Sequence, residues 1–169
     1  MADAPDLPRP SQLWKQLSPE RKQQAAEAFW SDDNASLEHA EAVAAIAQRI
    51  KFRAKSVITM AVEKKARQLA TLPAVSEMVA ARLLVSYHLE QQRPMMGHFL
   101  DALGIAHEEG LIADENLAPP DPEKLKGAAK AIAGSFPAED VSLYLSTLVW
   151  QDPETWGPLA EAPEIGVKA

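Results

Sequence analysis

The sequence predicts an all-α fold, a single globular helical domain of about seven helices with flexible arms at both ends. Thirty of its 169 residues are alanine, the residue that costs least in a helix and fits strands poorly. Apolar residues recur at helical spacing in several segments. The 7 glycines, the absence of cysteine and the 47% hydrophobic content exclude collagen-like, disulfide-rich and fully disordered classes.

Composition along the chain predicts three regions. Residues 1–12 are polar and carry three prolines, so we expect a flexible N-terminal arm. Residues 13–150 form the helical domain. Residues 151–169 contain prolines and acidic residues and are predicted to be a tail. The tail also holds Trp156, with Trp150 just before it, and these side chains either pin the tail to its own domain or anchor a partner.

Helix boundaries follow from capping chemistry. Ser18 and Asp121 each precede a proline and a glutamate, an order typical of a helix start. Gly104 fits the position just after a helix end, where Ile105 can fold back on Leu100. Residues 138–150 fit both a helix and a strand, and helix is preferred because a lone strand has no evident partner. Helices are therefore expected near residues 18–30, 36–50, 57–69, 74–91, 94–103, 122–133 and 138–150.

The stretch from Arg49 to Lys55 alternates charged and apolar residues with period 2. An unbroken helix would scatter its cations, whereas an extended segment would place them on one side. We therefore expect a break near residues 52–56, with Ile50 and Phe52 inward and the cations outward.

Residues 49–67 carry a net charge of +6 in a chain whose net charge is −7. This basic segment is either a docking patch for an acidic partner, phosphates or anionic lipid, or a solvated face that balances the acidic C-terminal half of the chain. The residues proposed for partner binding are Arg49, Lys51, Arg53 and Lys55.

A second candidate lies in residues 98–109. His98 and Asp101 are three residues apart on one helical face, and His107 follows shortly after Gly104. The three could form a pocket with acid–base or metal chemistry, or they could be local capping and surface residues. Two histidines without a third ligand make a weak metal signature, so no metal or cofactor is predicted. Phosphate-loop, dinucleotide-binding and hydrolase motifs are absent.

Met95, Met96 and Phe99 have two interpretations. They could line a docking groove, because methionine adapts to irregular partners, or they could fill the core.

The sequence thus favours a non-enzymatic protein-interaction module whose partner is another protein or a second copy of the chain. The alternative is a small-molecule or metal-dependent enzyme that uses His98, Asp101 and His107. A third possibility is weak binding of nucleic acid or another anion through residues 49–67, which the overall acidity disfavours. The acidic N-terminus and the lack of a long apolar run predict a cytoplasmic protein that does not enter the membrane.

Overall fold

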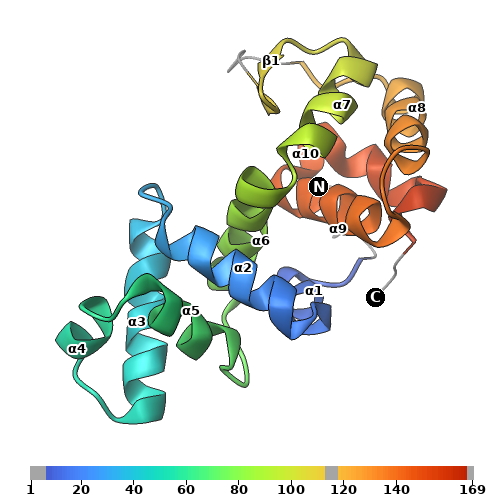
Figure 1. The fold of residues 1–169 in the computed structure, drawn as a ribbon. Coiled ribbons are helices and arrows are strands. Elements are labelled where there is room, and N and C mark those ends of the chain that lie inside the picture. The colour runs from blue at the N-terminus through green and yellow to red at the C-terminus, as the bar shows by residue number, and fades with distance from the viewer. Residues whose placement is uncertain (1–6, 113–117, 167–169) are drawn as a thin grey trace. The chain divides into compact units, whose positions relative to one another are not determined.

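The computed structural model describes residues 7–112 and 118–166, and this part of the chain contains ten α-helices and one two-stranded hairpin (Figure 1). The predicted all-α class is confirmed, with ten helices instead of about seven. The described residues divide into two compact units, an N-terminal unit of residues 10–90 and a C-terminal unit of residues 91–166 with residues 7–9. Neither unit boundary coincides with the ends of the predicted helical domain, residues 13–150.

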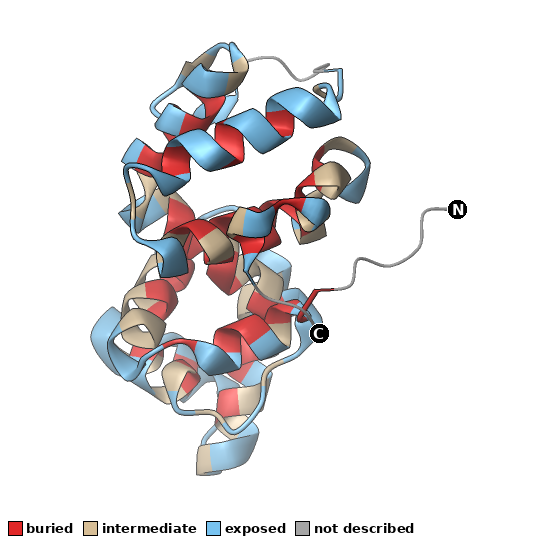
Figure 2. Ribbon diagram, turned by 90° about the vertical axis from the view of Figure 1, so that its right-hand side faces the viewer, coloured by how far each residue is buried: buried red, intermediate tan, exposed pale blue. Residues whose placement is uncertain are grey.

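The N-terminal unit contains six helices. Their bounds are α1 Pro10–Gln16, α2 Pro19–Trp30, α3 Ser36–Ile50, α4 Ala54–Ile58, α5 Val62–Ala70 and α6 Glu77–Gln91. Helix α2 packs mainly on α5, and α3 contacts both α4 and α5. In α3 and α5 the buried residues follow one stripe with exposed residues opposite, which is the amphipathic arrangement of a surface helix, whereas residues 79–89 of α6 include no exposed residue (Figure 2).

A part-buried polar contact connects the α2–α3 turn to α6 inside this unit. Both the Nε and Nη2 atoms of Arg82 donate to Oδ2 of Asp32, at 3.1 and 2.7 Å, and the Ser86 hydroxyl donates to the same oxygen. The amide of Asn34 donates to Oδ1. The carboxylate therefore has a partner on each oxygen, as a poorly solvated charge requires.

The C-terminal unit contains the remaining elements. They are α7 Arg93–Leu103, β1 His107–Glu108, β2 Leu111–Ile112, α8 Pro122–Ala133, α9 Ala138–Gln151, α10 Pro153–Trp156 and the 3₁₀ helices η1 Gly157–Glu161 and η2 Pro163–Ile165. Helix α8 packs on α7 and α9, and η1 contacts both α8 and α9. Phe99 meets the Tyr144 ring edge-on at 5.6 Å between centroids and also contacts Trp156.

The segment predicted as a tail is folded over residues 153–165. Trp156, Leu159 and Ile165 are buried in the C-terminal unit. At the other end of the chain Leu7 is buried as well, and the indole N–H of Trp150 donates to the carbonyl of Pro8 at 2.8 Å. Large apolar side chains in both predicted arms therefore contribute to the core. Residues 1–6 and 167–169 of those arms lie outside the described part.

Several predicted boundaries match the structure. The Ser18 hydroxyl accepts the amide of Arg21, and Asp121 caps α8 through the amide of Glu123. Gly104 ends α7 in the left-handed conformation, and the Ile105 amide reaches the Leu100 carbonyl. Residues 138–151 are helical, as preferred.

Other elements differ from the expectation. The break after α3 lies at residues 51–53, and the chain then enters α4 instead of an extended segment. Phe52, expected inward, is exposed. Residues 107–112, for which no strand is predicted, form the β1–β2 hairpin. None of the helices in the described residues combines the length and apolar character that crossing a bilayer requires.

Candidate functional site

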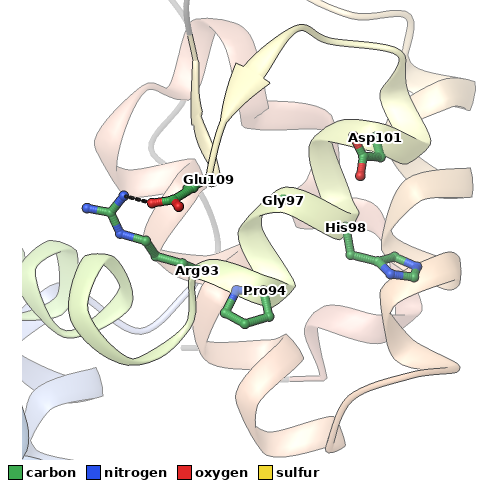
Figure 3. Close-up of a pocket in the computed structure, with 6 residues that line it drawn as sticks. All are labelled: Arg93, Pro94, Gly97, His98, Asp101 and Glu109. Carbon is green, nitrogen blue, oxygen red and sulfur yellow. Dashed lines mark ion pairs between the residues drawn. The ribbon is translucent and has the colours of Figure 1, made fainter.

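Two of the three predicted pocket residues, His98 and Asp101, line a groove on one face of α7, whereas His107 is not part of its lining. Pro94, Gly97, His98 and Asp101 follow the helical spacing that aligns side chains on one face. The groove has a volume of about 470 Å³, and Figure 3 shows its lining residues, all on α7 except Glu109 from the hairpin turn. Its lining, here named the α7 groove, consists of Arg93, Pro94, Gly97, His98, Asp101 and Glu109.

Two of the three predicted pocket residues, Asp101 and His107, are joined by a hydrogen bond. The His107 Nε2 lies 2.7 Å from Oδ1 of Asp101, and the Gly110 amide donates to His107 Nδ1 at 3.0 Å. Because Nδ1 accepts this bond, the proton of the neutral imidazole must be on Nε2, which donates to Asp101. Both ring nitrogens of His107 are therefore used in holding the hairpin to α7.

The third residue, His98, has different surroundings. Its ring packs edge-on to Phe136, with 5.8 Å between centroids. Figure 3 shows its imidazole directed away from the Asp101 carboxylate, although both line the α7 groove. The described residues contain no set of three or more histidine or acidic side chains placed to hold a metal ion. The groove thus holds the Asp101 carboxylate, the Glu109 carboxylate beside Arg93, and an imidazole that does not face Asp101.

The hairpin fits α7 through glycine. Glu109 and Gly110 both have positive φ values, 50° and 87°, as a tight two-residue hairpin turn requires. A Cβ on Gly110 would lie 2.8 Å from the Met96 Cβ and 3.2 Å from the Arg93 carbonyl oxygen. A Cβ on Gly97 would lie 3.2 Å from His107 Cε1. Close packing therefore fixes the position of the turn.

The apolar residues that were candidates for a docking groove lie in the interior. Met95 and Phe99 have no exposed surface, and Met96 is buried as well. The core interpretation of these three residues agrees with their burial, and they offer no surface to a partner.

The basic segment separates into two groups. The guanidinium of Arg49 donates to the carbonyl and the hydroxyl of Thr71, at the end of α5. Lys65 lies over the Trp30 ring at 4.8 Å, and Arg67 pairs with Glu63 at 3.3 Å. These three cations have partners inside the N-terminal unit, and only one of those partners, Glu63, is acidic.

The other three predicted cations point to solvent. Lys51, Arg53 and Lys55 are exposed, and none of them forms an ion pair with another described residue. Three apolar side chains within residues 52–62 also remain largely exposed, at 53% for Phe52, 58% for Ile58 and 41% for Val62. We name this set the α4 surface: Lys51, Phe52, Arg53, Lys55, Ile58 and Val62.

Lys51 has an unusual backbone conformation. It ends α3 with a φ of 58°, in the left-handed region that glycine adopts without steric cost. A lysine in this conformation costs about 1 kcal/mol. The turn thus carries a cation where glycine would be the less strained residue, and such local strain is common in functional segments.

The pKa shifts in the molecule arise in structural positions. Burial lowers the pKa of His88 to about 4, and burial raises the pKa of Tyr144. For Asp32, burial opposes ionisation, but the Asn34 amide and Arg82 outweigh it and lower the pKa. None of these three side chains lines the α7 groove or belongs to the α4 surface.

Sequence reasoning identified the cations of the α4 surface but missed its apolar members. The alternation with charges predicts Phe52 inward, and Ile58 and Val62 lie in the segment 57–69 that is predicted as a single helix. The exposure of Phe52, Ile58 and Val62 cannot be predicted from the sequence, because it depends on how α4 and α5 are placed in the folded unit.

No family model matches this chain, and no curated protein or solved structure shows significant similarity to it.

Proposed function

We propose that this protein is a non-enzymatic interaction module that binds an acidic, apolar-bearing segment of a protein through the α4 surface. The observation that carries the proposal is the exposure of Phe52, Ile58 and Val62 in the same short segment as three cations that form no ion pair within the described part of the chain. Exposed apolar side chains gathered together and bordered by polar residues are typical of protein interaction sites.

The charge of the α4 surface selects the partner. Three cations within five residues favour carboxylates by attraction and by faster encounter. The apolar side chains supply the buried area that charges at a solvated rim do not. A partner that alternates acidic and large apolar residues satisfies both.

A nucleic-acid ligand suits this surface less well. Nucleic-acid binding domains are usually strongly basic, whereas this chain has a net charge of −7. Phosphate contacts also leave Phe52 and Ile58 without an apolar counterpart. The enzymatic alternative has weaker support, because both nitrogens of His107 are engaged and His98 does not face Asp101.

The test is an NMR titration of the labelled full chain with a synthetic peptide that alternates glutamate with leucine or isoleucine. We expect the amide chemical shifts of residues 51–62 to change most when the peptide is added. R53E/K55E should abolish them, and Phe52→Ser should weaken binding about fivefold or more. Neither change should unfold the protein, because all three side chains are exposed.

Two matched variants serve as controls. K124E/K126E reverses two exposed lysines on α8 and gives the same net charge as R53E/K55E. Leu37→Ser removes an exposed apolar side chain at the other end of α3. Both should bind the peptide as the native chain does. Chemical-shift changes spread over the whole protein, or an equal loss of peptide binding in K124E/K126E, would overturn the proposal. Preferential binding of a DNA duplex or of anionic vesicles would overturn it as well.

A further inference from the structure

The β1–β2 hairpin carries exposed acidic side chains, whereas the α4 surface carries exposed basic ones. Glu108 and Glu109 are exposed, and Leu111 and Ile112 next to them keep 42% and 39% of their surface in solvent. Two carboxylates and two large apolar side chains thus occur within five residues. In the hairpin register Glu108 lies opposite Leu111 and His107 lies opposite Ile112, so Glu108 and Leu111 share one side of the ribbon and Ile112 lies on the other side. We name the side that carries Glu108 and Leu111, together with Glu109 at the turn, the hairpin face.

From this complementarity we infer that the acidic partner of the α4 surface is a second copy of this chain, which docks through its hairpin face. The inference rests on the proposed function and names the partner of the same surface. Carboxylates of the hairpin face would meet Arg53 and Lys55, while Leu111 would pack against Phe52.

The hairpin is well suited to docking because its backbone is already fixed. Gly110 fits closely against Met96 and the Arg93 carbonyl, and His107 bonds to both Gly110 and Asp101. A preorganised segment loses little conformational entropy on binding. Glu109 lies 3.8 Å from Arg93, but both side chains are solvated, so this pair competes only weakly.

The two surfaces differ, so each copy offers one donor face and one acceptor face. Such an arrangement is satisfied by a reciprocal dimer or by a longer head-to-tail assembly. The contact area of two short segments is small, and we expect association at the weak end of the range, with a Kd on the order of 100 µM.

The test is sedimentation velocity of the full chain from about 10 µM to about 1 mM. The native chain should sediment faster as its concentration rises. R53E/K55E makes both surfaces acidic, and E108K/E109K makes both basic, so each variant alone should remain monomeric. An equimolar mixture should associate again, because each surface then meets one of opposite charge. This rescue is not expected from variants that have simply lost their fold.

Control variants with the same net charges carry the changes elsewhere. K124E/K126E matches R53E/K55E, and E154K/E161K, which reverses two exposed glutamates of the C-terminal unit, matches E108K/E109K. Both controls should self-associate as the native chain does. A constant sedimentation coefficient of the native chain over the whole range, or a mixture that stays monomeric, would overturn the inference.

Failure of the inference and failure of the proposed function give different results. A native chain that stays monomeric but binds the acidic peptide at residues 51–62 keeps the interaction surface and removes only the second copy as its partner. A chain that neither self-associates nor binds the peptide overturns both.

Discussion

His107 joins two parts of the C-terminal unit through opposite edges of one ring. Its Nε2–H donates to Asp101 on α7, and its Nδ1 accepts the amide of Gly110 in the hairpin turn. The side chain is largely shielded from solvent, whereas Asp101 is mostly exposed. An imidazole used in this way sets the position of the hairpin face relative to α7.

Replacing this imidazole should loosen the hairpin. We expect His107→Ala to lower the free energy of unfolding by about 1–2 kcal/mol, because the Gly110 amide loses its acceptor in a buried position. Amide hydrogen exchange at Gly110 should accelerate. His98→Ala is the control, since His98 is exposed and should change stability by less than about 0.5 kcal/mol. Equal exchange at Gly110 in His107→Ala and the native chain would contradict this role.

Two glycines should respond to alanine in opposite directions. Gly110→Ala forces a side chain into a left-handed residue and brings Cβ to 2.8 Å from Met96 Cβ, so we expect a loss of about 2–4 kcal/mol. Gly127 lies in α8, is exposed and has no atom within 4 Å of an added Cβ. Gly127→Ala should raise stability by about 0.5–1 kcal/mol. Chemical denaturation measures both, and a neutral Gly110→Ala would show that the turn adjusts freely.

The same residues show how far the sequence could predict the molecule. Ser18, Gly104 and Asp121 act through local bonds, and their roles were readable because capping depends only on neighbouring residues. The hairpin was missed because its turn is Glu109-Gly110, whereas asparagine or aspartate before glycine is the familiar signal. Trp156 was placed in a tail because prolines surround it, although burial against Phe99 folds that segment.

The candidate sites were predicted only in part for a related reason. Asp101 and His107 are near in sequence, so their contact could be anticipated. Arg49 and Lys51 are only two residues apart in the sequence. Only Arg49 donates a hydrogen bond to Thr71, because the end of α5 lies beside the end of α3. Which cation is paired within its own unit depends on tertiary contacts that charge spacing does not encode.

The Asp32–Arg82 pair should support the N-terminal unit in a pH-dependent way. Asp32→Asn leaves Arg82 beside a neutral group, and we expect the free energy of unfolding at pH 7 to fall by about 2 kcal/mol. This is less than for a fully buried ion pair because both side chains are partly exposed. The folded pKa of Asp32 lies below its ordinary value of 3.8. Its contribution is therefore present above that value and disappears as pH falls through the folded pKa. Denaturation curves of the two proteins should converge in acid, and a constant difference down to pH 2 would contradict the pairing.

His88 should produce a separate loss of stability in mild acid. It lies in the last turn of α6, almost fully buried, and its Nδ1–H donates to the Leu84 carbonyl at 2.7 Å. Burial lowers its pKa from 6.5 to about 4. Between pH 6.5 and pH 4 the unfolded chain binds a proton at this histidine and the folded chain does not. The contribution of His88 to the free energy of unfolding is therefore fully present above pH 6.5 and falls by up to about 3 kcal/mol towards pH 4.

The His88→Leu variant separates this effect from other acid-sensitive groups. It removes the titrating ring and should flatten the stability profile between pH 6.5 and 4, whatever its own stability at pH 7. His98→Ala should retain the native slope because His98 is exposed. NMR titration of the His88 ring protons measures the folded pKa directly. A midpoint near 6.5 would mean that the ring is hydrated in the folded protein, and the slope would then have to arise from other groups.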